Sequence, residues 1–132
     1  MDPLQDNIEP VLAGYRVLVV EDDYFVAQDL CVTLREHGAT VFGPAPSIAS
    51  ARNLASTLRP DCVLLDINLD GEHAFELARE LQAGGTRTVF TTGYDASFVP
   101  MSLRSTLCLQ KPIDAGALLR GIRKQLPGKL PE

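Results

Sequence analysis

The sequence predicts an α/β fold in which a five-stranded parallel sheet carries helices on both of its faces. Short continuous apolar runs alternate with helix-period segments, and five such strand-then-helix units follow one another along the chain. The chain has 132 residues, enough for one compact domain with its own core. Hydrophobic residues make up 45% and charged residues 22% of it, a balance typical of globular proteins and not of disordered ones.

The first half of the chain contains the first two units. Residues 16–20 are a continuous apolar run, which predicts a strand buried on both faces. Apolar side chains at i, i+4 spacing predict the helix that follows, and His37-Gly38 should close it. Residues 40–42 predict a second, weaker strand, which we expect Gly43-Pro44 to stop. Ser47 is a good N-cap for the second helix.

The second half repeats the pattern with one ambiguous element. Pro60 should end the second helix, and Glu72 should lie in the first turn of the third. Pro100 interrupts any helix over residues 95–105, so we expect a short or distorted fourth helix there. Asp114 can cap the last helix. The remaining strands are expected at residues 62–65, 88–91 and 106–109, and the aromatic residues expected in the core are Phe25, Phe42 and Phe90.

Charge and cysteine content exclude several classes of protein. The net charge of −5, without a Lys/Arg cluster to offset it, disfavours nucleic-acid binding. No apolar run is long enough to span a membrane. Cys31, Cys62 and Cys108 show no pairing motif, which indicates reduced core cysteines and a cytoplasmic protein. We expect an N-terminal extension (1–14), one domain (15–126) and a C-terminal tail (127–132).

Acidic and polar residues follow the predicted strands at their carboxyl ends, where sheets of this kind place their binding sites. Glu21 and Asp22 follow the first strand, and Asp66 and Asn68 follow the third. If these strands are neighbours, the carboxylates converge and repel one another, so they need a cation. Oxygen ligands with open positions suit Mg²⁺.

This arrangement of residues favours phosphoryl chemistry. The Asp66 carboxylate could attack phosphorus and form an aspartyl phosphate. Such a transfer mainly needs charge neutralisation on the phosphoryl oxygens. Lys111 would supply a point charge, the Thr92 hydroxyl a hydrogen bond, and the backbone N–H groups near Ile67 and Gly93 further donors.

Four motifs in order, each at a strand end, carry a family resemblance: Leu18-Val19-Val20-Glu21-Asp22-Asp23, Leu64-Leu65-Asp66-Ile67-Asn68-Leu69, Thr91-Thr92-Gly93-Tyr94 and Gln110-Lys111-Pro112. With them the sequence resembles the receiver domains of bacterial response regulators over roughly residues 15–126. The resemblance implies the chemotaxis-type receiver fold, a flavodoxin-like (βα)5 arrangement with strand order 2-1-3-4-5.

The resemblance also implies a role for each site residue. Asp66 matches the phosphoacceptor. Asp22 matches the direct Mg²⁺ ligand, Glu21 the outer acid, and Asn68 the residue whose backbone carbonyl binds the metal. The phosphate-binding and switch positions are matched by Thr92, Gly93 and Lys111, and the Lys111-Pro112 bond is expected to be cis.

Two positions depart from the ordinary receiver pattern. Cys108 replaces the aromatic residue that usually stands three residues before the site lysine, so Tyr94 is the candidate for an alternative switch aromatic. Gly93-Tyr94 after the threonine is similar to the FAT-GUY receiver subfamily, although Thr91 replaces its usual alanine. We expect the Tyr94 ring to lie near the phosphoryl face and to slow hydrolysis of the phosphate.

The resemblance implies a two-component response regulator receiver that is not an enzyme. It would take a phosphoryl group from the phosphohistidine of a sensor histidine kinase, of the HWE or a related class, or of a phosphotransfer protein. The residues after the last helix are too few for an output domain, so the signal would pass to a downstream protein partner. The expected state is a monomer or weak dimer, with no nucleic acid bound and no membrane insertion.

Three alternatives compete with this interpretation. A Mg²⁺-dependent phosphatase with an aspartyl nucleophile usually has a second aspartate two residues later, and here Asn68 cannot protonate a leaving group. A phosphorylation-independent interaction module is supported only by Cys108. A nucleotide-binding module would need a glycine-rich loop where this chain has Glu21-Asp22-Asp23.

Overall fold

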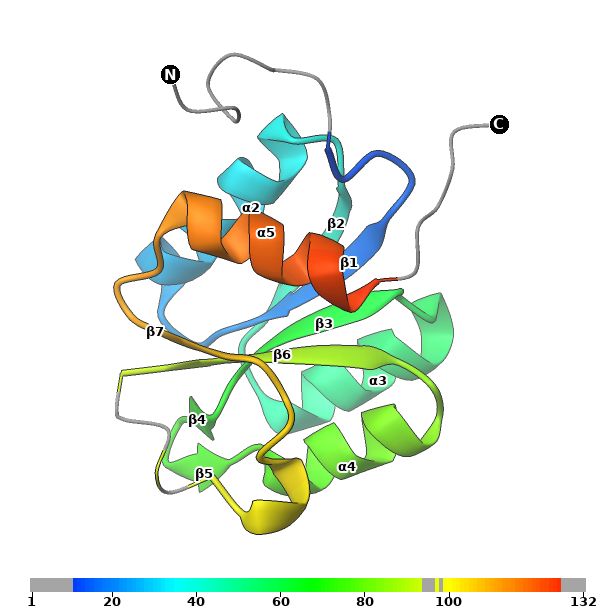
Figure 1. The fold of residues 1–132 in the computed structure, drawn as a ribbon. Helices are drawn as coiled ribbons and strands as arrows, with labels where there is room; N and C mark the ends of the chain where they lie inside the picture. Colours follow the sequence, from blue (N-terminus) through cyan, green and yellow to red (C-terminus); the bar gives the residue numbers. More distant parts are fainter. Residues whose placement is uncertain (1–10, 94–96, 98, 127–132) are drawn as a thin grey trace.

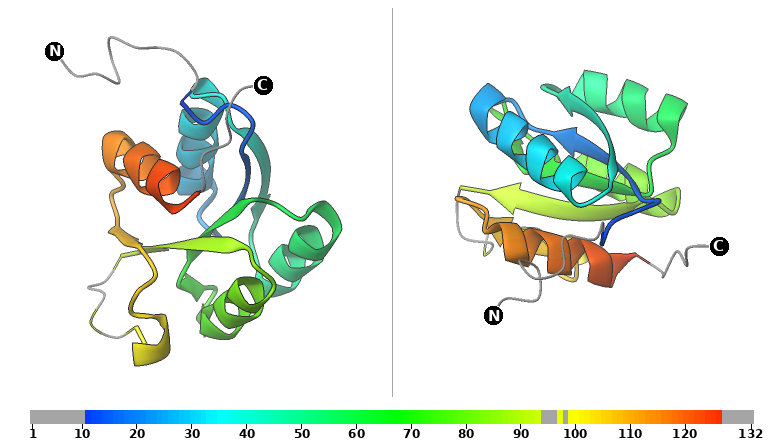
Figure 2. Two further views of the ribbon diagram at one scale, coloured as in Figure 1. Left: turned by 45° about the vertical axis from the view of Figure 1, so that its right-hand side comes forward. Right: turned by 90° about the horizontal axis from the view of Figure 1, so that it is seen from above.

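A computed structural model describes residues 11–93, 97 and 99–126 and shows a parallel sheet between two layers of helices (Figures 1 and 2). The sheet has five strands in the order β2-β1-β3-β6-β7, and all neighbours are parallel. Along the chain these are the second, first, third, fourth and fifth strands of the sheet, which confirms the predicted fold class. The strands are β1 (Arg16–Val20), β2 (Thr40–Ala45), β3 (Cys62–Asp66), β6 (Arg87–Thr92) and β7 (Cys108–Gln110).

The helices divide between the two faces of the sheet. They are α2 (Tyr24–Glu36), α3 (Ile48–Leu58), α4 (Phe75–Ala83) and α5 (Ala115–Gln125). Side chains alternate along a strand, so Val17 and Val19 of β1 pack under α2 and α5, whereas Leu18 and Val20 pack under α3 and α4. Each fully buried aliphatic side chain contributes roughly 1.5–3 kcal/mol, so the two cores hold the strand ends in fixed positions.

The predicted helix caps are present in the structure. The Ser47 hydroxyl accepts from the backbone N–H of Ser50 and forms a reciprocal capping box with it. Asp114 accepts from Ala117 N at the start of α5. The second helix ends at Leu58.

The second strand does not stop at Phe42 as predicted. It continues through Gly43 and Pro44 to Ala45. Gly43 has a φ of +97°, the Gly43-Pro44 bond is cis, and the register against β1 shifts between Leu18 and Val20. Because β2 is an edge strand, a residue without an N–H is tolerated there, so the glycine and proline bend the strand instead of ending it.

The prediction that Glu72 lies in the first turn of the third helix is also wrong. Glu72 lies in β5 (Glu72–His73), which pairs antiparallel with β4 (Asn68–Leu69). Asp70 and Gly71 form the tip with φ values of 49° and 85°. This small hairpin follows β3 directly and delays the helix until Phe75.

One further expectation is wrong, and another agrees with the structure. Phe25 is 79% exposed and stacks edge-on against Tyr24, whereas Phe42 and Phe90 are in or against the core as predicted. The described part of residues 95–105 contains the 3-10 turn η2 (Met101–Leu103), which agrees with a short fourth element.

Part of the predicted N-terminal extension packs onto the domain. The side chain of Leu12 is fully buried against α2, α5 and the sheet. Its backbone N–H donates to His37 O at 2.8 Å, and Arg123 donates to Val11 O at 2.7 Å. Leu12 therefore belongs to the core, and Val11 packs against it.

The cysteines behave as core residues. Cys31 and Cys62 are buried, Cys108 is half-buried, and all three are free thiols. Burial raises the pKa of Cys62 to about 12, which makes that thiol unreactive. Among the described helices none is both long and apolar enough to cross a membrane.

Candidate functional site

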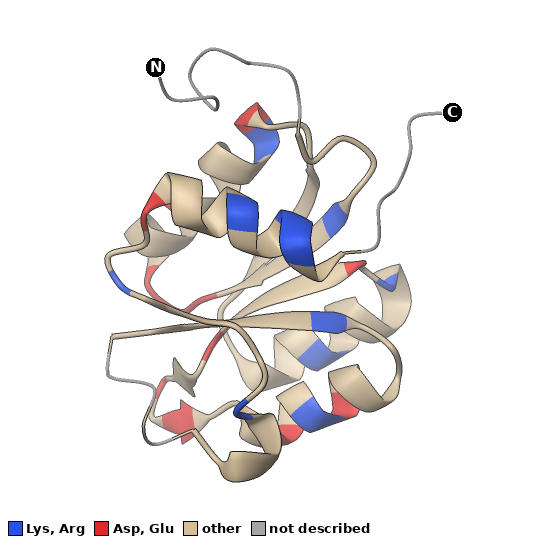
Figure 3. Cartoon of the chain, in the orientation of Figure 1, with Lys and Arg blue, Asp and Glu red and all other residues tan. Residues whose placement is uncertain are grey.

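Acidic residues lie where β1 and β3 end, at the edge of the sheet formed by the carboxyl ends of its strands (Figure 3). Ligand oxygens of Glu21, Asp22 and Asp66 all lie within 4.8 Å of one another. Glu21 and Asp66 are buried, while Asp22 is exposed. The parallel pairing of β1 with β3 thus brings together the three carboxylates that the sequence placed at separate strand ends.

Lys111, which directly follows the edge strand β7, joins this cluster. Its ammonium nitrogen donates to Asp66 Oδ2 at 2.8 Å and forms an ion pair with Glu21 Oε1 at 2.7 Å. The Lys111 backbone N–H donates to Thr92 O at 2.7 Å, which fixes the segment after β7 against the end of β6. The Lys111-Pro112 peptide bond is cis.

The remaining predicted residues surround Asp66. Thr92, the last residue of β6, is buried, and Gly93 follows it with open space on its Cα. Asn68 donates its backbone N–H to Asp66 Oδ1 at 3.0 Å. The Ile67 N–H donates to Thr91 O, so it is already engaged within the protein. Tyr94 lies outside the described residues.

Asp23 has a structural role. Its side chain accepts from Phe25 N at 3.0 Å and from Val26 N at 3.2 Å and caps α2. Its own N–H donates to Glu21 Oε2 at 3.0 Å, which holds the Glu21 carboxylate in place.

Sequence reasoning missed the contact between Asp22 and the β4–β5 hairpin. Asp22 Oδ2 accepts from Asp70 N at 2.7 Å, so the hairpin tip is tied to the end of β1. The available signal was the Asp70-Gly71 pair, a typical turn dipeptide that the sequence analysis did not use to predict a hairpin.

The electrostatics of the cluster leave negative charge uncompensated. Burial, together with the Asp66 charge, raises the pKa of Glu21 to about 7 in spite of the opposing effect of Lys111. Burial alone would lower the pKa of Lys111, but its bonds to Asp66 and Glu21 outweigh burial and raise it. One lysine therefore faces three carboxylates at this edge.

The residues present fit a hard divalent cation. All donors in the cluster are oxygens, and the exposed Asp22 leaves room for water ligands. The buried side-chain oxygen Oδ1 of Asn68 has no hydrogen-bond partner among the described residues. A cation bound by Asp22 and Asp66, with the Asn68 backbone carbonyl as a further candidate ligand and Glu21 behind them, would balance the excess charge.

Comparison with known proteins identifies the class. Residues 17–123 match the response regulator receiver domain, so the chain belongs to this family of two-component signalling proteins. The DNA-binding response regulator MtrA of Mycobacterium tuberculosis is 32% identical over 117 residues, 84% of this chain and 50% of that protein. The sensory transduction protein LytT of Bacillus subtilis is 28% identical over 113 residues, 83% of this chain and 47% of LytT.

Solved structures agree with this assignment. The signal receiver domain of a modulated diguanylate cyclase from Desulfovibrio desulfuricans G20 has a TM-score of 0.76 and 32% identity, covering 84% of this chain and 92% of that one. The BeF3-activated receiver domain of Klebsiella pneumoniae RstA has a TM-score of 0.75 and 26% identity, covering 86% and 99%. The chain spans about half the length of the two curated relatives named above.

Proposed function

We propose that Asp66 accepts a phosphoryl group from a phosphohistidine of a sensor histidine kinase or a phosphotransfer protein. The observation that carries this proposal is the position of the Asp66 carboxylate, which is buried at the carboxyl edge and bonded to Lys111 at 2.8 Å beside two further carboxylates. In this reaction an Asp66 oxygen forms a bond to phosphorus while the P–N bond of the phosphohistidine breaks. The imidazole nitrogen keeps the electron pair of that bond.

The protein's own groups would stabilise the transferred group by charge. When bound, Mg²⁺ neutralises phosphoryl oxygens and lowers the repulsion between the carboxylates. The Lys111 ammonium group, which now donates to Asp66, would move to one phosphoryl oxygen. The Thr92 hydroxyl and the Gly93 N–H would donate to the other phosphoryl oxygens. The Ile67 N–H already donates to Thr91, which leaves Gly93 as the better backbone donor.

Phosphorylation would then act on the elements that Thr92 contacts. Thr92 pairs with Gln110 of β7, and Phe90 pairs with Cys108. Movement of Thr92 toward the phosphoryl group would therefore be transmitted to β7 and to the segment before it, and this face would bind or release a downstream partner. Because Cys108 stands where an aromatic switch is usual, we propose Tyr94 for that role.

The finer assignments are part of the same proposal. We infer membership of the FAT-GUY subfamily and a kinase of the HWE class from the Gly93-Tyr94 motif. We infer a cytoplasmic location, a monomer or weak dimer, and a receiver domain over residues 15–126, onto which Val11 and Leu12 pack. Self-catalysed loss of the phosphate, slowed by Tyr94, completes the proposal.

Intact mass after incubation with Mg²⁺ and acetyl phosphate tests the acceptor. We expect one added phosphoryl group in the wild type and in Asp29→Asn, a matched control in which an exposed aspartate of α2 is changed. Asp66→Asn and an EDTA-treated sample should gain none. Addition to Asp66→Asn at the wild-type level would refute the assignment of Asp66. Failure of the wild type with both acetyl phosphate and a phosphorylated histidine kinase would favour the phosphorylation-independent interaction module.

A further inference from the structure

The β4–β5 hairpin, which follows the end of β3 (Figure 1), donates to both of the aspartates that would bind Mg²⁺. At its base, the Asn68 N–H donates to Asp66 Oδ1 at 3.0 Å. At its tip, the Asp70 N–H donates to Asp22 Oδ2 at 2.7 Å. Neither the family assignment nor the proposed function gives the contact at the tip a role.

The base of the hairpin is anchored in the core. Ile67, Leu69 and Ala74 are at most 1% exposed, and the Ala74 N–H donates to Ile67 O at 2.8 Å. Leu69 directly precedes Asp70, so its burial fixes the place from which the Asp70 N–H points at Asp22. A donor that is held by buried neighbours keeps its direction. The hairpin can therefore act as a rigid support for the carboxylate.

Asp22 depends on this support more than the other two carboxylates of the site do. Glu21 and Asp66 are buried, and both pair with Lys111. Asp22 is exposed. In the part of the chain that the structure describes, the Asp70 N–H is the one hydrogen-bond donor to the Asp22 side chain. An exposed side chain loses rotational freedom when it binds a ligand, so a hydrogen bond that already fixes it lowers that cost.

The turn that presents the Asp70 N–H depends on a glycine. Asp70 and Gly71 have φ values of 49° and 85°. The residues before and after them, Leu69 and Glu72, pair across the hairpin. Positive φ at both central residues is typical of a type I′ turn, for which Asp-Gly is a favoured pair. A Cβ on Gly71 would meet no atom within 4 Å beyond its chain neighbours, so a side chain there would disturb the turn through the backbone alone.

We propose that Asp70 is a positioning residue: its backbone N–H, held by the Asp70-Gly71 turn, orients the Asp22 carboxylate for a divalent cation. This role rests on the Mg²⁺ site of the proposed function. Groups that orient a metal ligand from behind change metal affinity by about 10–100-fold when they are lost. Because Asp22 is exposed and water competes for it, we expect about three- to tenfold here. By linkage, Mg²⁺ must in turn favour the closed turn by the same factor.

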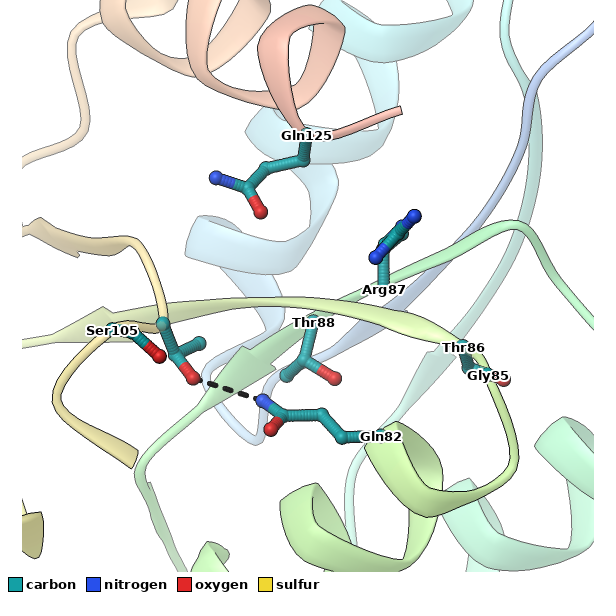
Figure 4. A pocket seen from close by; sticks show the side chains of 8 residues that line it. Gln82, Gly85, Thr86, Arg87, Thr88, Ser105 and Gln125 are labelled. Carbon is teal, nitrogen blue, oxygen red and sulfur yellow. Dashed lines mark hydrogen bonds between the residues drawn. The ribbon is translucent and has the colours of Figure 1, made fainter. Parts of the chain in front are cut away.

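A matched pair of glycine substitutions tests this role by calorimetric titration of the full chain with Mg²⁺. Gly85 resembles Gly71, with a φ of 89° and no atom within 4 Å of its Cβ position beyond its chain neighbours. It lies at the opposite end of the sheet, beside a polar pocket between α4 and the start of β6 (Figure 4). Gly71→Ala should weaken Mg²⁺ binding about three- to tenfold, and Gly85→Ala should leave it within about twofold. Equal affinity in the two variants would overturn the proposal. Tighter binding by Gly71→Ala would overturn it too, because the hydrogen bond would then compete with the cation.

Asp70→Asn separates the backbone N–H of Asp70 from the charge of its side chain. Asparagine adopts positive φ readily and keeps the backbone donor, but it removes the carboxylate. In about 0.5 M KCl, where exposed charges are screened, the Mg²⁺ affinity of this variant should stay within about twofold of the wild type. A loss as large as that expected of Gly71→Ala would mean that the Asp70 charge attracts the cation, which would contradict the role of the N–H.

Hydrogen exchange of the Asp70 amide in ¹⁵N-labelled protein measures the contact directly. In EDTA this amide should exchange at least about threefold faster in Asp22→Ala than in the wild type, because the variant lacks the acceptor. Saturating Mg²⁺ should slow the exchange further in the wild type and should not do so in Asp22→Ala. Unchanged exchange in either comparison would overturn the proposal. A wild type that binds no Mg²⁺ would overturn both the metal site and this role, whereas failure of Asp66 as the phosphoacceptor would leave these measurements intact.

Discussion

Replacing Glu21 by glutamine should stabilise the metal-free protein at neutral and alkaline pH. Glu21 is buried, and burial, with the nearby Asp66 charge, raises its pKa from 4.5 to about 7. A carboxyl group whose pKa is higher in the folded state destabilises that state when it ionises. The loss of stability therefore begins near pH 4.5, the value for the unfolded chain, and is complete above about pH 7.

The size of the effect follows from that difference in pKa. Each unit corresponds to 1.36 kcal/mol, so the shift of Glu21 gives an upper value of about 3 kcal/mol. Solvent reaches the site beside the exposed Asp22 and screens the charges, so we expect about 1–2 kcal/mol in practice. Glutamine keeps the shape without the charge, and Lys111 retains its bond to Asp66.

The destabilisation by ionised Glu21 is measured by thermal unfolding of the wild type and Glu21→Gln in EDTA, at pH 5 and pH 8. At pH 8 the variant should melt higher, by about 3–5 °C for each kcal/mol, and the difference should shrink at pH 5. Adding Mg²⁺ at pH 8 should stabilise the wild type more than the variant, because the cation compensates the Glu21 charge. A variant that is no more stable than the wild type at pH 8 would refute the reasoning.

Three other substitutions test separate contacts by urea unfolding. Lys111→Met should cost about 3 kcal/mol at pH 7 without metal, because it leaves two buried carboxylates unpaired, and Mg²⁺ should restore part of it; an unchanged midpoint would argue against the ion pairs. Ser47→Ala should cost about 1 kcal/mol by removing the capping box; no loss would mean that the cap is dispensable. Gly43→Ala should cost more than Gly85→Ala, although both have positive φ, because only the former places its Cβ 2.6 Å from Val19 O; equal losses would contradict this contact.

The main strands and the convergence at the carboxyl edge were predictable for a physical reason. β1, β3 and β6 are buried on both faces; β1 and β3 are largely apolar runs, and the buried part of β6 consists of β-branched and aromatic residues. Once their parallel order is assumed, the residues that end them must meet, and Glu21 and Asp66 do.

The elements that were mispredicted depend on contacts that a local pattern does not contain. Phe25 was assigned to the core by residue type alone, yet it shares the outer side of α2 with Gln28 and Asp29, and helical phase decides its exposure. β5 has two residues, too few for any period to show, and only the turn at Asp70 indicates it. The prediction that Pro44 ends its strand would hold in a central strand, where proline removes a hydrogen bond of the sheet. It is wrong for β2 because β2 is an edge strand.

The burial of Leu12 determines where a fragment or a fusion protein that contains this domain should begin. The family match begins at residue 17, and a fragment started there or at Tyr15 would lack Leu12 and the carbonyl to which Arg123 donates. The void left by a buried leucine costs about 2–5 kcal/mol, a large share of what holds a domain of this size together. A truncated version would therefore be prone to unfolding and proteolysis for reasons unrelated to Asp66, so fusions should keep the residues from Val11 onward.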